Sequence, residues 1–129
     1  SEAMWEYACR AGTQTRFYTG DKDEDLDRAG WYSGNAGGQT HPVGEKEPNK
    51  FGLYDMHGNV WEWCGDWYQR DYYSRSPVQN PSGPDIGCHR VHRGGSWVFD
   101  AGQLRSAFRN YYKPVDSYHN LGFRIVRND

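Results

Sequence analysis

Residues 51–64 read Phe51-Gly52-Leu53-Tyr54-Asp55-Met56-His57-Gly58-Asn59-Val60-Trp61-Glu62-Trp63-Cys64. Glycine and asparagine are the residues that turns demand, and here they are followed by a run in which polar and apolar side chains alternate. Alternation with a period of two places one set of side chains on each face of a strand. We therefore expect a shaped turn that leads into a half-buried strand.

Outward from this stretch, three further strands are expected. Residues 90–97 read as a strand in which the pair Gly94-Gly95 marks a bulge or a close backbone approach. Residues 104–109 and 122–126 are the last two strand candidates. Residues 69–88 contain three prolines, which excludes a central strand there.

The best helix lies at residues 1–12. Ser1 suits the N-cap, Gly12 suits the C′ position, and the apolar residues Met4, Trp5, Ala8 and Cys9 share one face. Residues 13–50 are rich in Gly, Asp, Asn and Thr and predict long irregular loops with short strands.

The acidic run at residues 21–27 alternates as a calcium loop does. Leu26 stands where an EF-hand requires glycine, and Tyr32 stands where it requires the closing glutamate. We therefore expect a solvated acidic loop here.

Composition narrows the class of protein. The chain has 129 residues, a length that predicts a single domain. Aromatic residues make up 16% of it. The formal net charge is −2 with both signs interspersed, which does not indicate a nucleic-acid partner. No apolar run approaches the roughly 20 residues that span a bilayer, so direct membrane insertion is not expected. Cys9, Cys64 and Cys88 are too few for a disulfide framework.

Six motifs together resemble the formylglycine-generating-enzyme (sulfatase-modifying factor) family, in the family's order. The resemblance implies an α+β fold, a variant of the C-type lectin fold that is loop-rich with short antiparallel strands and few helices. It implies one domain over residues 1–129 that lacks the family's usual N-terminal portion. The motifs are Trp5-Glu6-Tyr7-Ala8-Cys9-Arg10-Ala11-Gly12, Phe51-Gly52-Leu53-Tyr54-Asp55-Met56, Gly58-Asn59-Val60-Trp61-Glu62-Trp63, Arg93-Gly94-Gly95-Ser96-Trp97, Arg105-Ser106-Ala107-Phe108-Arg109 and Leu121-Gly122-Phe123-Arg124.

The family's enzymes bind copper with a cysteine pair just after the Gly-Gly-Ser-aromatic motif, and thiolates are the soft ligands that Cu(I) requires. Here residues 98–104 read Val-Phe-Asp-Ala-Gly-Gln-Leu, and no cysteine follows Cys88. We therefore expect no copper, no required cofactor and no catalysis. Iron-dependent relatives use histidines, but none of His41, His57, His89, His92 and His119 has a convincing metal-ligand spacing.

Short polar and aromatic clusters in residues 98–120 resemble those of the variable proteins of diversity-generating retroelements, which share this fold. In those proteins asparagine codons are randomised at adenines, and every residue type in the clusters here can arise in that way. Tyrosine and asparagine are also typical recognition residues. The candidate ligand-binding residues are Val98, Phe99, Asp100, Phe108, Asn110, Tyr111, Tyr112, Tyr118, His119 and Asn120.

We expect most of these side chains to be exposed, and Phe108 to pack inward because it lies between motif residues. The expected ligand is a macromolecule, a protein in preference to a sugar. The alternative is a catalytically silent or accessory relative of the oxidase that acts on sulfatases. The sequence does not predict an oligomeric state. The resemblance to the retroelement proteins implies display on a bacterial or viral surface, and without that resemblance we expect a cytoplasmic location.

The remaining motif residues are expected to form the scaffold. Core positions are predicted for Trp5, Trp61, Trp63, Trp97 and Phe123, with a partner for each indole N–H. Arg105, Arg109 and Arg124 are expected to bond to backbone carbonyls and carboxylates. Asn59 and Glu62 match residues near which family members bind calcium. Two readings stay open: a structural Ca²⁺, or an arginine paired with Glu62 while Asn59 shapes the turn.

Overall fold

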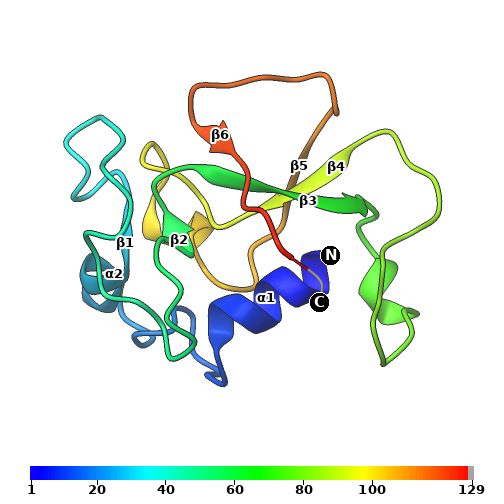
Figure 1. The fold of residues 1–129 in the computed structure, drawn as a ribbon, viewed down its shortest axis with the longest axis horizontal. Coiled ribbons are helices and arrows are strands. Elements are labelled where there is room, and N and C mark those ends of the chain that lie inside the picture. Colours follow the sequence, from blue (N-terminus) through cyan, green and yellow to red (C-terminus); the bar gives the residue numbers. More distant parts are fainter. Residues whose placement is uncertain (128–129) are drawn as a thin grey trace.

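A computed structural model describes residues 1–127. A four-stranded sheet lies between one helix below it and long loops above and beside it (Figure 1). Within these residues no helix is long and apolar enough to cross a membrane. The elements are α1 (Glu2–Arg10), α2 (Asp23–Ala29), β1 (Gly30–Trp31), β2 (His57–Gly58), β3 (Trp61–Trp67), the 3₁₀ turn η1 (Tyr72–Ser74), β4 (Arg90–Arg93), the 3₁₀ turn η2 (Ala101–Gln103), β5 (Asn110–Tyr112) and β6 (Leu121–Gly122).

The strand order in the main sheet is β5-β4-β3-β6. The β3–β4 and β4–β5 pairs are antiparallel, whereas β6 runs parallel to β3. The separate pair β1–β2 is also parallel. The expected α+β, loop-rich fold is confirmed, with a mixed sheet in place of a purely antiparallel one.

Helix α1 confirms the expected helix at residues 1–12. The Ser1 hydroxyl accepts a hydrogen bond from the backbone N–H of Met4 at 3.3 Å. The helix ends where Ala11 turns into the left-handed region at φ 44°. Ser1 thus caps the helix as the sequence indicates. At the other end Ala11 is the first left-handed residue, and Gly12 follows it with a φ of 92°.

Helix α2 corrects the expected solvated loop at residues 21–27. Its Leu26 and Ala29 are fully buried, and they pack in a cluster with Phe17 and Leu104. The Asp25 carboxylate accepts a hydrogen bond from the backbone N–H of Lys22 at 3.0 Å. Three acidic residues in its first turn also favour the helix dipole. Burial of one apolar face therefore outweighs the acidic composition.

Two strand predictions were too long and one was wrong. Residues 104–109 form no strand. Bends and a turn occupy residues 104–107 directly after η2, and Arg105 bonds back to the Gly102 carbonyl at 2.8 Å. Strand β4 ends at Arg93, where Gly94 and Gly95 take φ values of 95° and 77°. A Cβ on Gly95 would lie 2.5 Å from the Leu104 side chain, so glycine is required there. Strand β6 (Leu121–Gly122) overlaps the expected strand at residues 122–126 only at Gly122.

The core sits between α1 and the sheet. It contains Trp5, Cys9, Met56, Cys64 and Val91. Trp61 is also fully buried, as expected, but Trp63 and Trp97 are only half-buried. Phe123 contradicts its predicted core position, because 76% of it is exposed.

The hydrogen-bond partners predicted for the indole N–H groups of the motif tryptophans are present only in part. The Trp5 indole N–H donates to Glu62 at 2.8 Å. The buried indole nitrogens of Trp61 and Trp97 have no hydrogen-bond partner among the described residues. The expectation of a partner for each indole was therefore wrong at these two rings, which are held by ring packing instead.

Candidate ligand-binding surface

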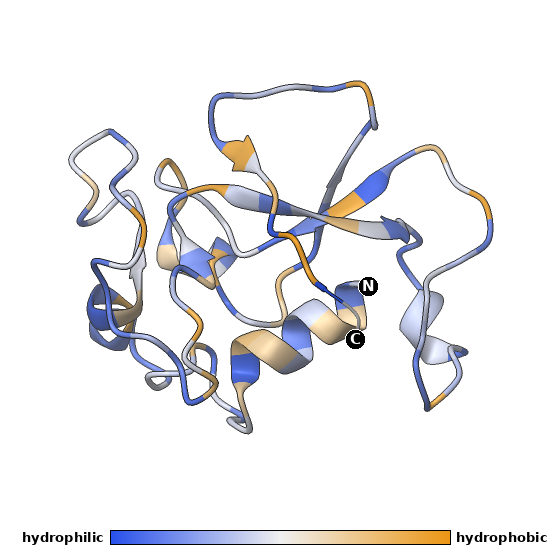
Figure 2. Ribbon diagram, viewed as in Figure 1, coloured by the Kyte–Doolittle hydropathy of each residue, from blue (hydrophilic) through white to orange (hydrophobic). Residues whose placement is uncertain are grey.

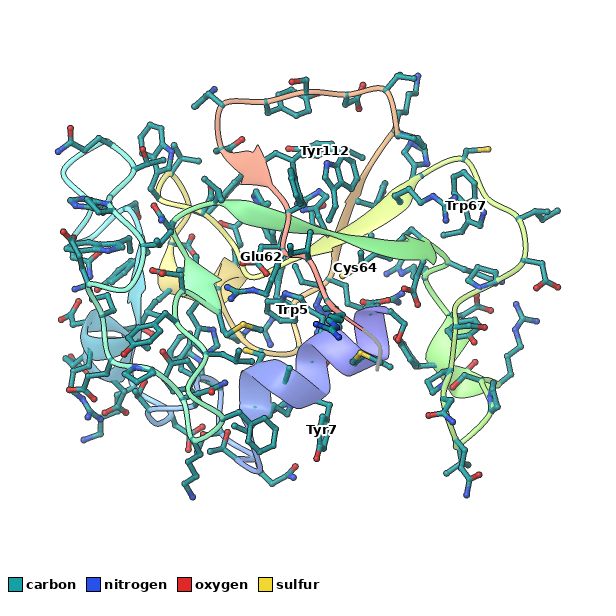
Figure 3. The ribbon with its side chains drawn as sticks, viewed as in Figure 1. Trp5, Tyr7, Glu62, Cys64, Trp67 and Tyr112 are labelled. Atoms are coloured by element: carbon teal, nitrogen blue, oxygen red, sulfur yellow. The ribbon has the colours of Figure 1, made fainter. Side chains whose placement is uncertain are left out.

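The two faces of the sheet carry different side chains. Val91 faces α1 and is fully buried in the core with Cys64. The neighbouring residue His92 faces the other way, since successive side chains alternate along a strand. Figure 3 shows Trp5 and Cys64 between α1 and the sheet, with Tyr112 on the side away from α1. The candidate surface is therefore built on the sheet face opposite the helix.

Trp61 is the centre of this outer face. Its ring lies 5.5 Å from that of Phe99 and 6.1 Å from that of Phe108. Its ring is also 4.6 Å from that of His92, in an edge-to-face arrangement. Three separate chain segments thus pack on one buried indole, which is completely shielded from solvent. The predicted inward packing of Phe108 is confirmed.

A second row of rings continues outward from His92. The Tyr112 ring stacks on His92 at 4.5 Å, and the Tyr118 ring lies 4.6 Å from Tyr112. Tyr118 is 45% exposed. His119 is exposed and its ring lies 5.6 Å from that of Trp97. The loop that contains Tyr118 and His119 is thereby held above the sheet (Figure 1).

The remaining candidates divide by exposure. Val98, Asp100 and Tyr111 are exposed, and Asn110 is half-buried. Asp100 also caps η2, because its carboxylate accepts from the Gly102 N–H at 2.9 Å. These side chains are available to a ligand without belonging to the core.

Asn120 is a correction, since it is buried and not exposed. Its side-chain N–H₂ donates to the Ser96 hydroxyl at 3.1 Å. Its backbone carbonyl accepts from the Trp61 N–H at 2.8 Å. Only 6% of the residue is exposed, because these bonds hold the start of β6 against β3. Asn120 therefore belongs to the scaffold.

Tyr111 is separated from the other candidates. It follows the register of Val91 and so lies on the opposite face of β5 from Tyr112. Its ring stacks on Tyr68 at 4.0 Å, with His89 at 5.1 Å. The sequence analysis missed Tyr68 and His89 as neighbours of the candidate site. Strand alternation at two adjacent tyrosines was the signal that Tyr111 and Tyr112 diverge.

Three arginines hold the segments that frame this surface, as predicted. Arg109 bonds to both oxygens of Glu2 at 2.7 and 2.9 Å. Arg124 bonds to Glu62 and to the Tyr54 carbonyl, each at 2.8 Å. Arg109 thus fastens the segment before β5 to α1, and Arg124 fastens the segment after β6 to β3, whereas Arg105 makes a local bond to the η2 backbone.

The buried thiols are chemically quiet. Burial raises the pKa of Cys9 and that of Cys64 to about 12. Both therefore stay protonated at neutral pH, and a protonated thiol is a poor nucleophile and a poor metal ligand. The Cys9 sulfur lies 3.7 Å from the His57 ring, but burial lowers the pKa of His57 to about 4, so His57 carries no charge that would favour a thiolate. Cys88 is exposed.

Asn59 and Glu62 already have protein partners. The Asn59 side chain bonds to the backbone N–H and carbonyl of His41 at 3.1 and 3.0 Å. Glu62 is bonded by Arg124 and Trp5. This arrangement is the arginine-paired alternative. Residues 1–127 contain no group of three or more His, Cys, Asp or Glu that could hold a metal ion. Carboxylate and amide oxygens suit a hard cation, and calcium here stays a prediction.

The buried histidines predict a pH dependence of stability. Burial lowers the pKa of His57 and of His92 from 6.5 to about 4. Below pH ~6.5 the unfolded chain therefore binds protons that the folded chain does not. The free energy of unfolding is expected to fall between pH 6.5 and 4, by roughly 3 kcal/mol for each ring. In urea titrations across this range, His92→Phe should lose distinctly less stability than the wild type. An unchanged pH dependence would contradict the assignment for His92.

Comparison with known proteins completes the description of the site. The family model of the sulfatase-modifying factor enzyme 1-like domain matches residues 1–129. The chain belongs to this family. A formylglycine-generating enzyme of Streptomyces coelicolor is 39% identical, over 99% of this chain and 46% of its own length. A serine/threonine-protein kinase, pkn1, of Chlamydia pneumoniae is 38% identical, over 99% of this chain and 20% of the kinase.

Among solved structures of the family fold, Treponema denticola variable protein 1 superimposes with a TM-score of 0.90 at 39% identity. The match covers 95% of this chain and 44% of the Treponema protein. The chain thus spans less than half the length of each of these three relatives. The expected likeness to the family and to a variable protein is confirmed, and the whole-protein activities of the relatives do not follow from it.

Proposed function

We propose that this chain is a noncatalytic ligand-binding domain that presents a variable aromatic and polar surface to a protein partner. The surface comprises Val98, Phe99, Asp100, Asn110, Tyr112, Tyr118 and His119. Phe99 packs directly on Trp61, whereas Tyr112 and Tyr118 are stacked outward from His92, which itself packs on Trp61. The observation that carries the proposal is the convergence of three chain segments on that one indole. A rigid scaffold beneath exposed loop residues is the arrangement that recognition sites commonly use.

The chemistry of the surface supports a macromolecular ligand. Tyrosine offers a large contact area at a low cost in side-chain entropy, and Asn and Asp supply adaptable hydrogen bonds. Two hollows among the described residues, one beside α1 and both beside the segment that follows β6, are lined by none of these surface residues. The candidate residues therefore form a contact face, which suits a protein better than a small molecule.

The alternative is a silent or accessory relative of the sulfatase-modifying oxidase, and the named Streptomyces enzyme supports it. Against catalysis in the chain itself stand two facts. Residues 98–105 lack the cysteine pair that holds copper in those enzymes. The two buried thiols are protonated in other parts of the core. The chain's own residues favour binding.

A diversified library tests the proposal. Simultaneous randomisation of Val98, Asp100, Tyr112, Tyr118 and His119 is expected to leave most displayed variants protease-resistant, and selection on immobilised lysozyme should yield binders. The matched control library randomises five buried positions and should yield almost no folded members. The control positions are Trp61, Val91, Ser96, Leu104 and Asn120.

Two further observations would decide against the proposal. The first is a gene neighbourhood without a reverse transcriptase and without a near-copy of the segment encoding residues 98–120 that differs at adenines. The second is copper-dependent conversion of a sulfatase peptide's cysteine to formylglycine by the purified chain, which would support the oxidase instead.

A further inference from the structure

Two fully buried rings, Trp61 and His92, form the floor of the candidate ligand surface, and their centres are 4.6 Å apart. The indole nitrogen of Trp61 and both ring nitrogens of His92 have no hydrogen-bond partner among the described residues. Buried polar groups in proteins are nearly always paired. A phenylalanine in place of His92 would pack as a ring without leaving nitrogens unbonded, so ring packing alone does not account for the histidine.

His92 reaches the floor because it alternates with Val91 along β4, which Figure 2 shows as one hydrophobic segment between hydrophilic ones. Burial lowers the pKa of His92 to about 4, so its imidazole is neutral at pH 7. The Tyr111 backbone opposes this shift, yet neither ring nitrogen meets it with hydrogen-bond geometry. Among the described residues, no charged side chain contributes to the low pKa. The floor is therefore polar but uncharged.

The three unbonded nitrogens define the chemical group that complements them. The indole of Trp61 is a donor only, and a neutral imidazole has one donor and one acceptor nitrogen. The floor thus offers two donors and one acceptor. A primary carboxamide has the matching set, because its carbonyl oxygen accepts two hydrogen bonds and its NH₂ group donates. A carboxylate only accepts, and burying its charge beside an uncharged floor is costly.

Tyr112 covers the floor at His92. Its ring stacks on His92 at 4.5 Å and lies 4.6 Å from the ring of Tyr118. Tyr112 is half-buried, whereas Tyr118 is exposed. Among the described residues, no hydrogen bond of the Tyr112 side chain holds it in place. A ring held by stacking alone can move aside without breaking a hydrogen bond.

We propose that Tyr112 covers a carboxamide-binding floor, and that the partner protein inserts an asparagine or glutamine side chain there. The inserted carboxamide displaces the Tyr112 ring, accepts hydrogen bonds from Trp61 and His92, and donates one to His92. This assignment rests on the proposed function, because the floor lies under the same surface and faces the same partner. Residue 112 thereby determines specificity: a large ring closes the floor, and a small side chain opens it.

Carboxamide probes test this assignment on the full 129-residue chain. Tyr112→Ala removes the cover, and propionamide, propionate and N,N-dimethylpropionamide are each titrated into the variant. Nuclear magnetic resonance follows the indole N–H of Trp61 and the ring nitrogens of His92. Propionamide is expected to shift all three signals and to bind about tenfold more tightly than the other two, because it alone satisfies both donors and the acceptor without a charge. The wild type should bind propionamide more weakly than the variant, because the Tyr112 ring must first move.

Tyr111→Ala is the matched control. It removes the same ring from the same strand, but that ring stacks on Tyr68 and not on His92. Its affinity for propionamide should equal that of the wild type. Adding His92→Phe to Tyr112→Ala keeps a ring in the floor while removing two nitrogens, and should abolish the preference for propionamide. Tyr112→Val, which keeps a strand-forming residue in β5, opens the same floor if the alanine variant does not fold.

Equal binding of the three probes by the opened variant would overturn the assignment. So would a propionamide titration that leaves the Trp61 and His92 signals unmoved, which is also the result expected if a tightly held water molecule bonds these nitrogens. The library selection tests the proposed function separately, because its binders can engage the exposed clusters without reaching the floor. Binders obtained from a library whose opened floor shows no carboxamide preference would support the proposed function and refute the carboxamide site.

Discussion

Replacing Arg93 by methionine is expected to lower the free energy of unfolding by about 3–5 kcal/mol. The Arg93 side chain is fully buried and bonds to Glu2 at 2.8 Å and to the Ser106 carbonyl at 2.6 Å. It also bonds to Glu6. Methionine removes the charge and leaves the Glu2 carboxylate, which is 1% exposed, with Arg109 as its remaining cationic partner. Removing one of the two arginines that neutralise a buried carboxylate leaves its charge undercompensated, which is strongly destabilising.

Urea denaturation followed by tryptophan fluorescence measures this effect. The matched control is Arg75→Met, which removes an exposed pair with Asp71 at 3.1 Å. Surface pairs of this kind contribute about 0–1 kcal/mol. If Arg93→Met and Arg75→Met had the same stability, the buried network would not be what joins α1 to β4.

Trp61→Ala is expected to cost about 3–5 kcal/mol and to disorder the candidate ligand surface. The cost arises because alanine leaves a cavity where the completely buried indole packed. Phe99 and Phe108 would lose their shared contact, so near-ultraviolet circular dichroism should weaken beyond the loss of one tryptophan.

Tyr118→Ala is the control for this second effect. Tyr118 is 45% exposed and contacts the surface through Tyr112 alone among the ring pairs described. Its loss is expected to change stability by less than about 1 kcal/mol. A Trp61→Ala protein with wild-type stability and an unchanged near-ultraviolet spectrum would mean that Trp61 does not support the surface.

The buried residues Arg93 and Trp61 stabilise the fold, whereas the exposed candidate residues contribute the ligand surface. Arg93 and Trp61 act on opposite faces of the same sheet, one toward α1 and one toward the ligand face. Changes at the exposed clusters are expected to leave both arrangements intact, because Val98, Asp100, Tyr118 and His119 are exposed. A domain built in this way can vary its recognition residues while keeping its fold, which is what the proposed function requires.

The features that were predicted correctly depend mostly on residues close together in the sequence. Ser1 caps α1 because its hydroxyl needs only the next turn of backbone, and glycines mark the end of β4 because only they tolerate a positive φ beside Leu104. The expectations that were wrong depend on contacts between residues that are far apart in the sequence. The acidic segment forms α2 because Leu26 and Ala29 pack with the nearby Phe17 and with Leu104, which lies far away in the sequence.

The amino-acid sequence by itself determined the family, the α+β class, the first helix, the turn and strand of residues 51–64, and the absence of a cysteine pair after Gly95. These features depend on residue identity and on contacts within a few positions. Only the tertiary structure decided that Asn120 is buried, which of Tyr111 and Tyr112 lies on the candidate ligand face, and that Phe123 is exposed. Each of these outcomes depends on strand register and on which distant segments cover a face, and no short stretch of chain encodes either.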